Sequence, residues 1–94
     1  MEEKAAVEVR ITGDVQGVGF RFFAERVASR LGIVGYVMNR RDGSVFVQAE
    51  GRREALLAFL DQLKRGPSGA SVEGFEVKWG PYEGRFKDFT IRFF

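Results

Sequence analysis

The sequence predicts an α+β fold in which two amphipathic helices cover one face of an antiparallel sheet. Segments that alternate apolar and polar residues occur near both ends and in the middle of the chain, as expected for half-buried strands. Two other segments repeat apolar residues at helical spacing. The chain has 94 residues, of which 45% are hydrophobic, and this suffices for one core but not for two ordinary domains. We therefore expect residues 1–94 to form a single domain.

The first predicted strand spans residues 7–12, because Val7, Val9 and Ile11 alternate there with polar side chains. The next segment, residues 13–19, includes three glycines among its seven residues. This composition fits neither the helical nor the strand period and favours a tight loop. We expect the chain to turn here and to enter a helix.

The first predicted helix begins at Phe20 and is terminated by Gly32, because glycine is common just after the last helical turn. Arg21 therefore falls in its first turn. The apolar residues expected on the core stripe of this helix are Phe22, Phe23, Ala24, Val27, Ala28 and Leu31.

A hairpin is predicted in the middle of the chain, with strands at residues 34–39 and 44–50. The turn between them ends in Asp42-Gly43, a pair that favours hairpins. In the strand at residues 44–50 one face is clearly more apolar than the other. The more apolar face carries Val45, Val47 and Ala49, and the outward face carries Ser44, Phe46 and Gln48.

The second predicted helix covers residues 52–64 and is stopped by Gly66-Pro67. A strand at residues 72–79, a polar loop at residues 80–88 and a short last strand at residues 89–93 complete the chain. The resulting order is typical of the ferredoxin-like βαββαβ sandwich, with one short strand added at the C-terminus.

Cysteine and histidine are both absent. Their absence excludes disulfides, thiolate catalysis and phospho-histidine or phospho-cysteine intermediates, and it leaves only carboxylates as metal ligands. The net charge of +2 permits an anionic partner, but charges of both signs are interspersed, unlike a nucleic-acid-binding tail. No apolar run approaches the roughly 20 residues that cross a bilayer, and the start of the chain lacks signal-peptide character. We expect a cytoplasmic protein that contacts no membrane. Arginine outnumbers lysine, which leans toward a thermostable protein.

The glycine-rich loop precedes a predicted helix, where free backbone N–H groups and the positive end of the helix dipole favour anions. Arg21 adds a planar, permanently charged fork that matches two phosphoryl oxygens. Together these groups predict a phosphate cradle. The loop lacks the Gly-Lys-Ser/Thr of a Walker sequence and the glycine spacing of a dinucleotide fingerprint.

Asn39 ends the strand that follows the first helix. A right-handed crossover makes this strand parallel to the first one, so their carboxyl ends share one edge of the sheet. We therefore expect Asn39 near the glycine-rich loop. Its carboxamide can donate and accept hydrogen bonds, which is sufficient to orient a water molecule.

Residues 13–21 (Gly-Asp-Val-Gln-Gly-Val-Gly-Phe-Arg) and 35–39 (Gly-Tyr-Val-Met-Asn), followed by Gly43-Ser44-Val45 and Gly51, closely resemble the two signature motifs of the acylphosphatase family. The resemblance extends over nearly the whole chain. It implies hydrolysis of small-molecule acyl phosphates to a carboxylate and inorganic phosphate, without metal or cofactor. Asn39 would orient the attacking water, and Tyr36 replaces the tryptophan common in the family. The phosphoryl group would be bound by Val15, Gln16, Gly17, Val18, Gly19, Phe20 and Arg21.

Each feature taken alone also has a plain structural interpretation. The glycines suit any turn, Arg21 suits a solvated helix surface and Asn39 suits a hairpin. Two other functions fit parts of this pattern. An RNA-binding module has the same element order, but the first and third strands offer only Phe46 as an exposed aromatic. A phosphate- or carbamoyl-phosphate-binding domain of a larger maturation enzyme would share the loop. We expect a monomeric acylphosphatase that binds no nucleic acid.

Overall fold

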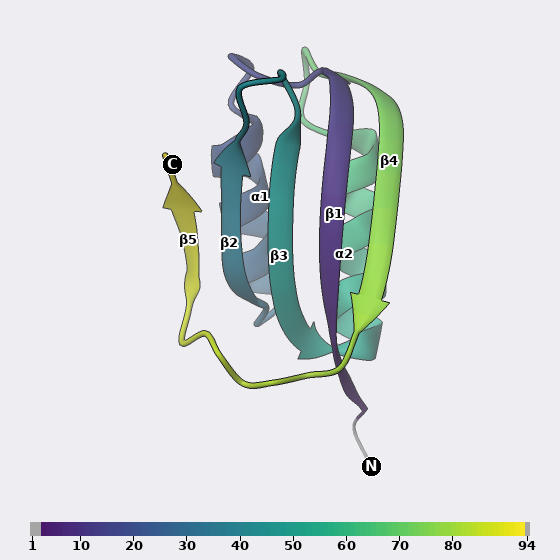
Figure 1. Cartoon of the computed structure of the whole chain (residues 1–94), viewed down its shortest axis with the longest axis vertical. Coiled ribbons are helices and arrows are strands. Elements are labelled where there is room, and N and C mark those ends of the chain that lie inside the picture. The colour runs from purple at the N-terminus through teal and green to yellow at the C-terminus, as the bar shows by residue number, and fades with distance from the viewer. Residues whose placement is uncertain (1–2, 94) are drawn as a thin grey trace.

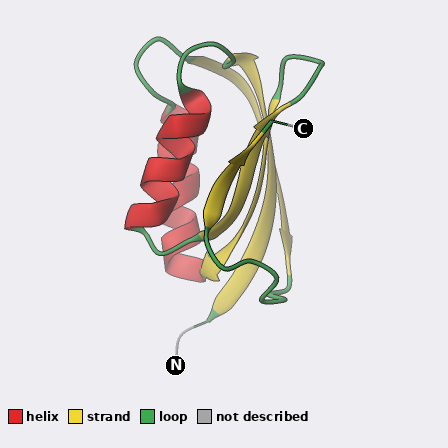
Figure 2. Ribbon diagram, turned by 90° about the vertical axis from the view of Figure 1, so that its left-hand side faces the viewer, coloured by secondary structure: helices red, strands yellow, loops and turns green. Residues whose placement is uncertain are grey.

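The computed structural model describes residues 3–93 and places two helices on one face of a five-stranded sheet (Figures 1 and 2). This arrangement confirms the predicted α+β, ferredoxin-like fold class. In chain order the elements are β1 (Lys4–Asp14), α1 (Phe20–Arg30), β2 (Val34–Asn39), β3 (Val45–Arg52), α2 (Arg53–Arg65), β4 (Ser71–Gly80) and β5 (Phe89–Arg92).

The strands lie in the order β4-β1-β3-β2-β5. The first four pair in an antiparallel manner, with Val9 of β1 opposite both Val47 and Val77. β5 instead pairs parallel to β2, so the sheet is mixed, whereas the sequence predicted an antiparallel sheet and gave no partner for the short added strand. The physical reason is the segment at residues 80–88, which carries the chain back along the lower end of the sheet before β5 begins (Figure 1).

The core lies between the sheet and the helices. Val7, Val9 and Ile11 of β1 are at most 1% exposed, in agreement with the alternating pattern. The prediction that Phe22 faces the core is wrong, because its side chain is 59% exposed. Two positions along a helix correspond to about 200° of rotation, so Phe22 points away from the buried stripe. That stripe in α1 consists of Phe20, Ala24, Val27 and Ala28.

Ser44 also differs from its predicted place. It lies in the hairpin turn rather than on the outer face of β3, which begins one residue later at Val45. Its hydroxyl and backbone N–H both donate to Oδ1 of Asp42, at 2.6 and 2.9 Å. These two hydrogen bonds satisfy the polar groups of Ser44 and allow the residue to be 1% exposed.

The segment at residues 80–88 is tied to the sheet by Glu50. This residue is 1% exposed, and its carboxylate accepts hydrogen bonds from the backbone N–H groups of Glu83 at 2.7 Å and Arg85 at 3.0 Å. Beyond this attachment, Phe89 packs edge-to-face on Phe59 of α2 with ring centroids 5.8 Å apart. The sequence pattern gave no sign of a buried carboxylate here, because its hydrogen-bond donors lie more than thirty residues away.

The sheet face opposite the helices carries more aromatic side chains than the sequence suggested. Besides Phe46, it includes Tyr36 from β2, whose ring centroid lies 6.1 Å from that of Phe46. Guanidinium groups cover both rings, that of Arg92 at 3.8 Å from Tyr36 and that of Arg40 at 4.1 Å from Phe46. The rings are therefore already stacked within the protein.

Candidate active site

The glycine-rich loop between β1 and α1 lies at the end of the sheet drawn uppermost in Figure 1. Gly17 and Gly19 both have a φ of 77°, and Gly19 is the N-cap of α1. A Cβ at either position would meet no atom within 4 Å, so glycine is favoured by the left-handed backbone and not by lack of space. Val15 and Phe20 anchor the loop in the core, at 1% and 2% exposed.

Backbone donors gather along this loop and the first turn of α1. In the described part of the chain, the N–H groups of residues 16–22 have no hydrogen-bond acceptor, and the first helical bond at this end runs from Phe23 N–H to the Gly19 carbonyl. The side chains of the first turn include no acidic residue. The loop therefore offers a set of unpaired donors at a positive helix end, which suits a phosphoryl group.

Arg21 extends from the first turn of α1 and is partly buried. Its guanidinium carbon lies 4.8 Å from the ring centroid of Phe93, just beyond β5. Within residues 3–93, no carboxylate forms an ion pair with Arg21. The aromatic contact thus supports the guanidinium without neutralising the charge that an anionic substrate would meet.

Asn39 is the last residue of β2 and pairs with the fully buried Val45 of β3. It lies on the same face of the strand as Val37, which is 0% exposed and faces the helices. Among the described residues, its side-chain Oδ1 is the only buried side-chain nitrogen or oxygen without a hydrogen-bond partner. A buried acceptor without a partner is costly in a folded protein, and a bound water that donates to Oδ1 would remove that cost.

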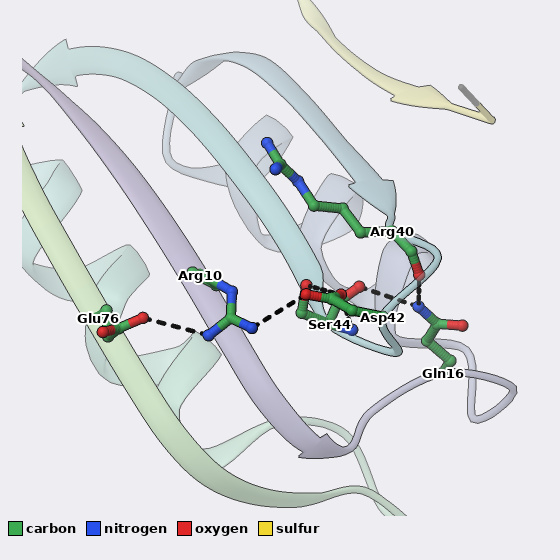
Figure 3. A network of polar contacts seen from close by, with 6 residues as sticks. All are labelled: Arg10, Gln16, Arg40, Asp42, Ser44 and Glu76. Carbon is green, nitrogen blue, oxygen red and sulfur yellow. Dashed lines mark hydrogen bonds and ion pairs between the residues drawn. The ribbon is translucent and has the colours of Figure 1, made fainter.

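The side chain of Gln16 joins the loop to the β2–β3 hairpin (Figure 3). Its Nε2 donates to the carbonyl oxygens of Arg40 at 2.7 Å and Ser44 at 2.9 Å. Arg40 follows Asn39 directly, so these bonds place the turn after Asn39 against the loop. The sequence predicted the Gln16 backbone as a phosphate contact but not this use of the side chain, because the partners lie more than twenty residues away.

The hairpin is held in turn by charged groups on the outer face of the sheet. Arg10 of β1 bridges Asp42 at 3.0 Å and Glu76 of β4 at 3.3 Å (Figure 3). The Ser44 hydroxyl and backbone N–H, together with the Arg10 guanidinium, hold the pKa of the Asp42 carboxyl well below its usual range. Hydrogen bonds to Asp42 and Glu76 raise the pKa of Arg10.

Two other kinds of site are absent from residues 3–93. No group of three or more His, Cys, Asp or Glu side chains is placed to hold a metal ion. No helix is long and apolar enough to cross a bilayer. Among the described residues, the upper end of the sheet carries unpaired backbone donors, the Arg21 guanidinium and the unpaired Oδ1 of Asn39.

The chain is similar in sequence and structure to known proteins of one family. A family model described as Acylphosphatase matches residues 7–91. The chain is 49% identical to an acylphosphatase of Thermotoga maritima, over 95% of this chain and 98% of that protein. It is also similar to the crystal structure of the Bacillus subtilis acylphosphatase, with a TM-score of 0.92, 32% identity and coverage of 95% of this chain and 99% of the other.

A larger protein shares the fold as well. The chain matches T. kodakarensis HypF with a TM-score of 0.81 and 34% identity, and the match covers 94% of this chain but only 12% of that one. The relatives that match along nearly their whole length carry the acylphosphatase name. Its two motifs, its fold and these similarities together show that the chain belongs to the acylphosphatase family.

Proposed function

We propose that this acylphosphatase holds the phosphoryl group of its substrate with Arg21 and the loop N–H groups, while Asn39 orients the attacking water. The observation that carries this proposal is that, within residues 3–93, unpaired donors, a guanidinium without an ion pair and an unpaired acceptor lie at one end of the sheet. The substrate class is the acyl phosphates on which the family acts, and the products are a carboxylate and inorganic phosphate.

The cradle supplies what this reaction demands. The water oxygen bonds to phosphorus while the bond from phosphorus to the acyl oxygen breaks, and the carboxylate leaves with the electron pair. Carboxylic acids have a pKa of about 4, so the leaving group needs no proton from the enzyme. The main requirement is stabilisation of charge on the phosphoryl oxygens, which preorganised N–H groups and Arg21 provide.

Asn39 supplies position rather than basicity. Its Oδ1 accepts a hydrogen bond from the water and aims a lone pair of the water oxygen at phosphorus. We further propose that the proton released by the water passes to a phosphoryl oxygen of the substrate itself, because an amide is not a base. The site grips only the phosphoryl end, and broad tolerance of the acyl group follows.

Hydrolysis of benzoyl phosphate in the presence of a chelator tests the metal-free reaction, with a phosphate monoester as the control substrate. We expect turnover of the acyl phosphate, unchanged by the chelator, and little turnover of the monoester. Loss of activity on chelation, restored by adding a metal ion, would overturn the metal-free mechanism.

Other features stay predictions of the sequence: a single domain, a monomer, a cytoplasmic location and no binding of nucleic acid. The stacking of Arg40 and Arg92 on the outer aromatic rings supports the last of these, since bases would have to displace both guanidiniums. Size-exclusion chromatography with light scattering measures the oligomeric state. Titration with single-stranded RNA tests the binding of nucleic acid.

A further inference from the structure

We propose that Gln16 is a positioning residue, which sets the distance between the phosphate cradle and the water held by Asn39. This inference rests on the roles proposed above for the loop and Asn39. The loop fixes the phosphorus atom and the end of β2 fixes the water, yet the two come from elements separated by the whole of α1. The side chain that bridges them directly is that of Gln16 (Figure 3).

The bridge consists of two hydrogen bonds from one amide group. Nε2 of Gln16 donates to the carbonyls of Arg40 and Ser44, at 2.7 and 2.9 Å. Both carbonyls also accept hydrogen bonds inside the hairpin, from Gly43 N–H at 3.1 Å and Arg40 N–H at 2.8 Å respectively. Without Gln16 each carbonyl would keep one partner, so the hairpin would still close while its link to the loop would be lost.

Glutamine meets a specific chemical requirement here. The bridge needs two N–H donors on one atom, at the end of a side chain long enough to span from loop to hairpin. Glutamate has the same length but presents only acceptors when ionised, and methionine has no donor.

The hairpin end of the bridge is itself held firmly. The carboxylate of Asp42 accepts hydrogen bonds from the hydroxyl and the N–H of Ser44, and Arg10 of β1 donates to the same carboxylate. Gln16 therefore joins the loop to a turn whose own geometry is set by the neighbouring strands. Loss of the bridge would shift the loop relative to Asn39 without dismantling either part.

The test is Gln16→Met, with Gln62→Met on the exposed side of α2 as the matched control. Misplacement of reacting groups by about 1 Å can cost ~100-fold in rate, so we expect a 10- to 100-fold lower kcat for benzoyl phosphate. The inhibition constant of inorganic phosphate should change less than about threefold, because Arg21 and the N–H groups remain. A rise in that constant with unchanged kcat would overturn the proposal. Gln16→Glu should behave like Gln16→Met, and if circular dichroism shows both variants unfolded, Gln16 is a folding residue and the proposal fails.

A double-mutant cycle with Asn39→Ala separates this inference from the function on which it rests. If Gln16 acts through Asn39, Gln16→Met should lower kcat less than about threefold in the Asn39→Ala background, a strongly non-additive result. Additive losses would overturn the role of Gln16 and leave that of Asn39 intact. An Asn39→Ala variant with undiminished kcat would instead overturn the water-orienting role itself.

Discussion

At the residue scale, Arg21 and Asn39 are each left with unused interaction capacity. Arg21 stacks on Phe93 and has no ion pair within the described residues, while Asn39 buries an acceptor that no described donor reaches. A charged group without an ion pair and a buried acceptor without a donor are typical of residues that act on a ligand. Single substitutions at these two positions therefore test ligand interactions more than packing.

Replacement of Arg21 by Ala should lower kcat/KM about 100-fold or more, because a preorganised charge on the phosphoryl oxygens is lost. Arg21→Lys should also fail to restore activity, since a point charge cannot grip two oxygens as a fork does. Steady-state kinetics and phosphate inhibition measure both effects. Arg26→Ala, on the exposed side of the same helix, is the control and should keep full activity. Near-normal kinetics for Arg21→Lys would contradict the fork argument.

Replacement of Asn39 by Ala should lower kcat roughly 100- to 1000-fold, as expected for loss of one preorganised hydrogen bond. Phosphate should still bind, because the cradle and Arg21 are unchanged. Isothermal titration with inorganic phosphate, beside the kinetics, distinguishes this result from general damage. Loss of phosphate binding in parallel with kcat would show that Asn39 shapes the cradle instead of placing the water.

At the element scale, two attachments far from each other hold the pieces of the site in register. The β2–β3 hairpin is joined to β1 through Asp42 and Arg10, and the segment at residues 80–88 is joined to β3 through Glu50. The second attachment matters for the site because β5 follows that segment and leads to Phe93, which stacks on Arg21. In both attachments a carboxylate accepts hydrogen bonds from N–H groups. Carboxylates are stronger acceptors than neutral oxygens.

Glu50→Gln should lower the free energy of unfolding by about 1–3 kcal/mol, because an amide presents a donor to one of the two N–H groups that the carboxylate accepts. Urea denaturation measures the loss. Hydrogen exchange should also quicken in β5 more than in β3, since β5 depends on the segment that Glu50 holds. Glu73→Gln, at an exposed position of β4, is the matched control. Equal protection of β5 in both variants would contradict this account of the attachment.

The hairpin should respond to acid through Asp42, whose pKa is lower in the folded protein than in the unfolded chain. The stability it contributes is therefore complete above the ordinary aspartate pKa of about 3.9 and is lost as pH falls below that value. We expect wild type to melt at a higher temperature than Asp42→Ala near pH 7, with a difference that shrinks below about pH 4. Calorimetry between neutral and acid pH measures the difference. A constant difference over that range would contradict the linkage.

At the scale of the whole molecule, the net charge of +2 is small, but three arginines lie at or beside the candidate site. Arg40 and Arg41 occupy the hairpin beside the site, and Arg21 lies within it. An anionic substrate should therefore be attracted over distances comparable to the Debye length.

This attraction predicts that kcat/KM for benzoyl phosphate falls as ionic strength rises, while kcat changes little. Arg41→Ala should lower kcat/KM about twofold at low salt and have less effect at high salt. Arg30→Ala, at the far end of α1, serves as the control and should leave kcat/KM unchanged at both low and high salt. A salt effect on kcat alone would point to a structural cause.

The sequence located the elements well where a local signal marks their ends. Residues 34–39 are a strand with the predicted bounds, and α1 begins at Phe20 as expected after the glycine-rich loop. Phe22 was misplaced because it lies about 200° around the helix from Phe20 and the buried stripe. Ser44 was misplaced because β3 begins one residue later than predicted. The parallel pairing of β5 was missed because periodicity shows that a strand forms, but not its partner.

By itself the sequence determined the family and the order of the elements and named the residues of the candidate site, because motifs and periodic patterns are local properties of the chain. Arg21, Asn39 and the loop at residues 15–20 needed no coordinates to be named. Only the tertiary structure decided that Gln16 reaches Arg40 and Ser44, that Glu50 holds residues 83 and 85, and that Phe93 supports Arg21. These contacts join residues more than twenty positions apart, and strand pairing, which follows from packing of the complete core, brings them together.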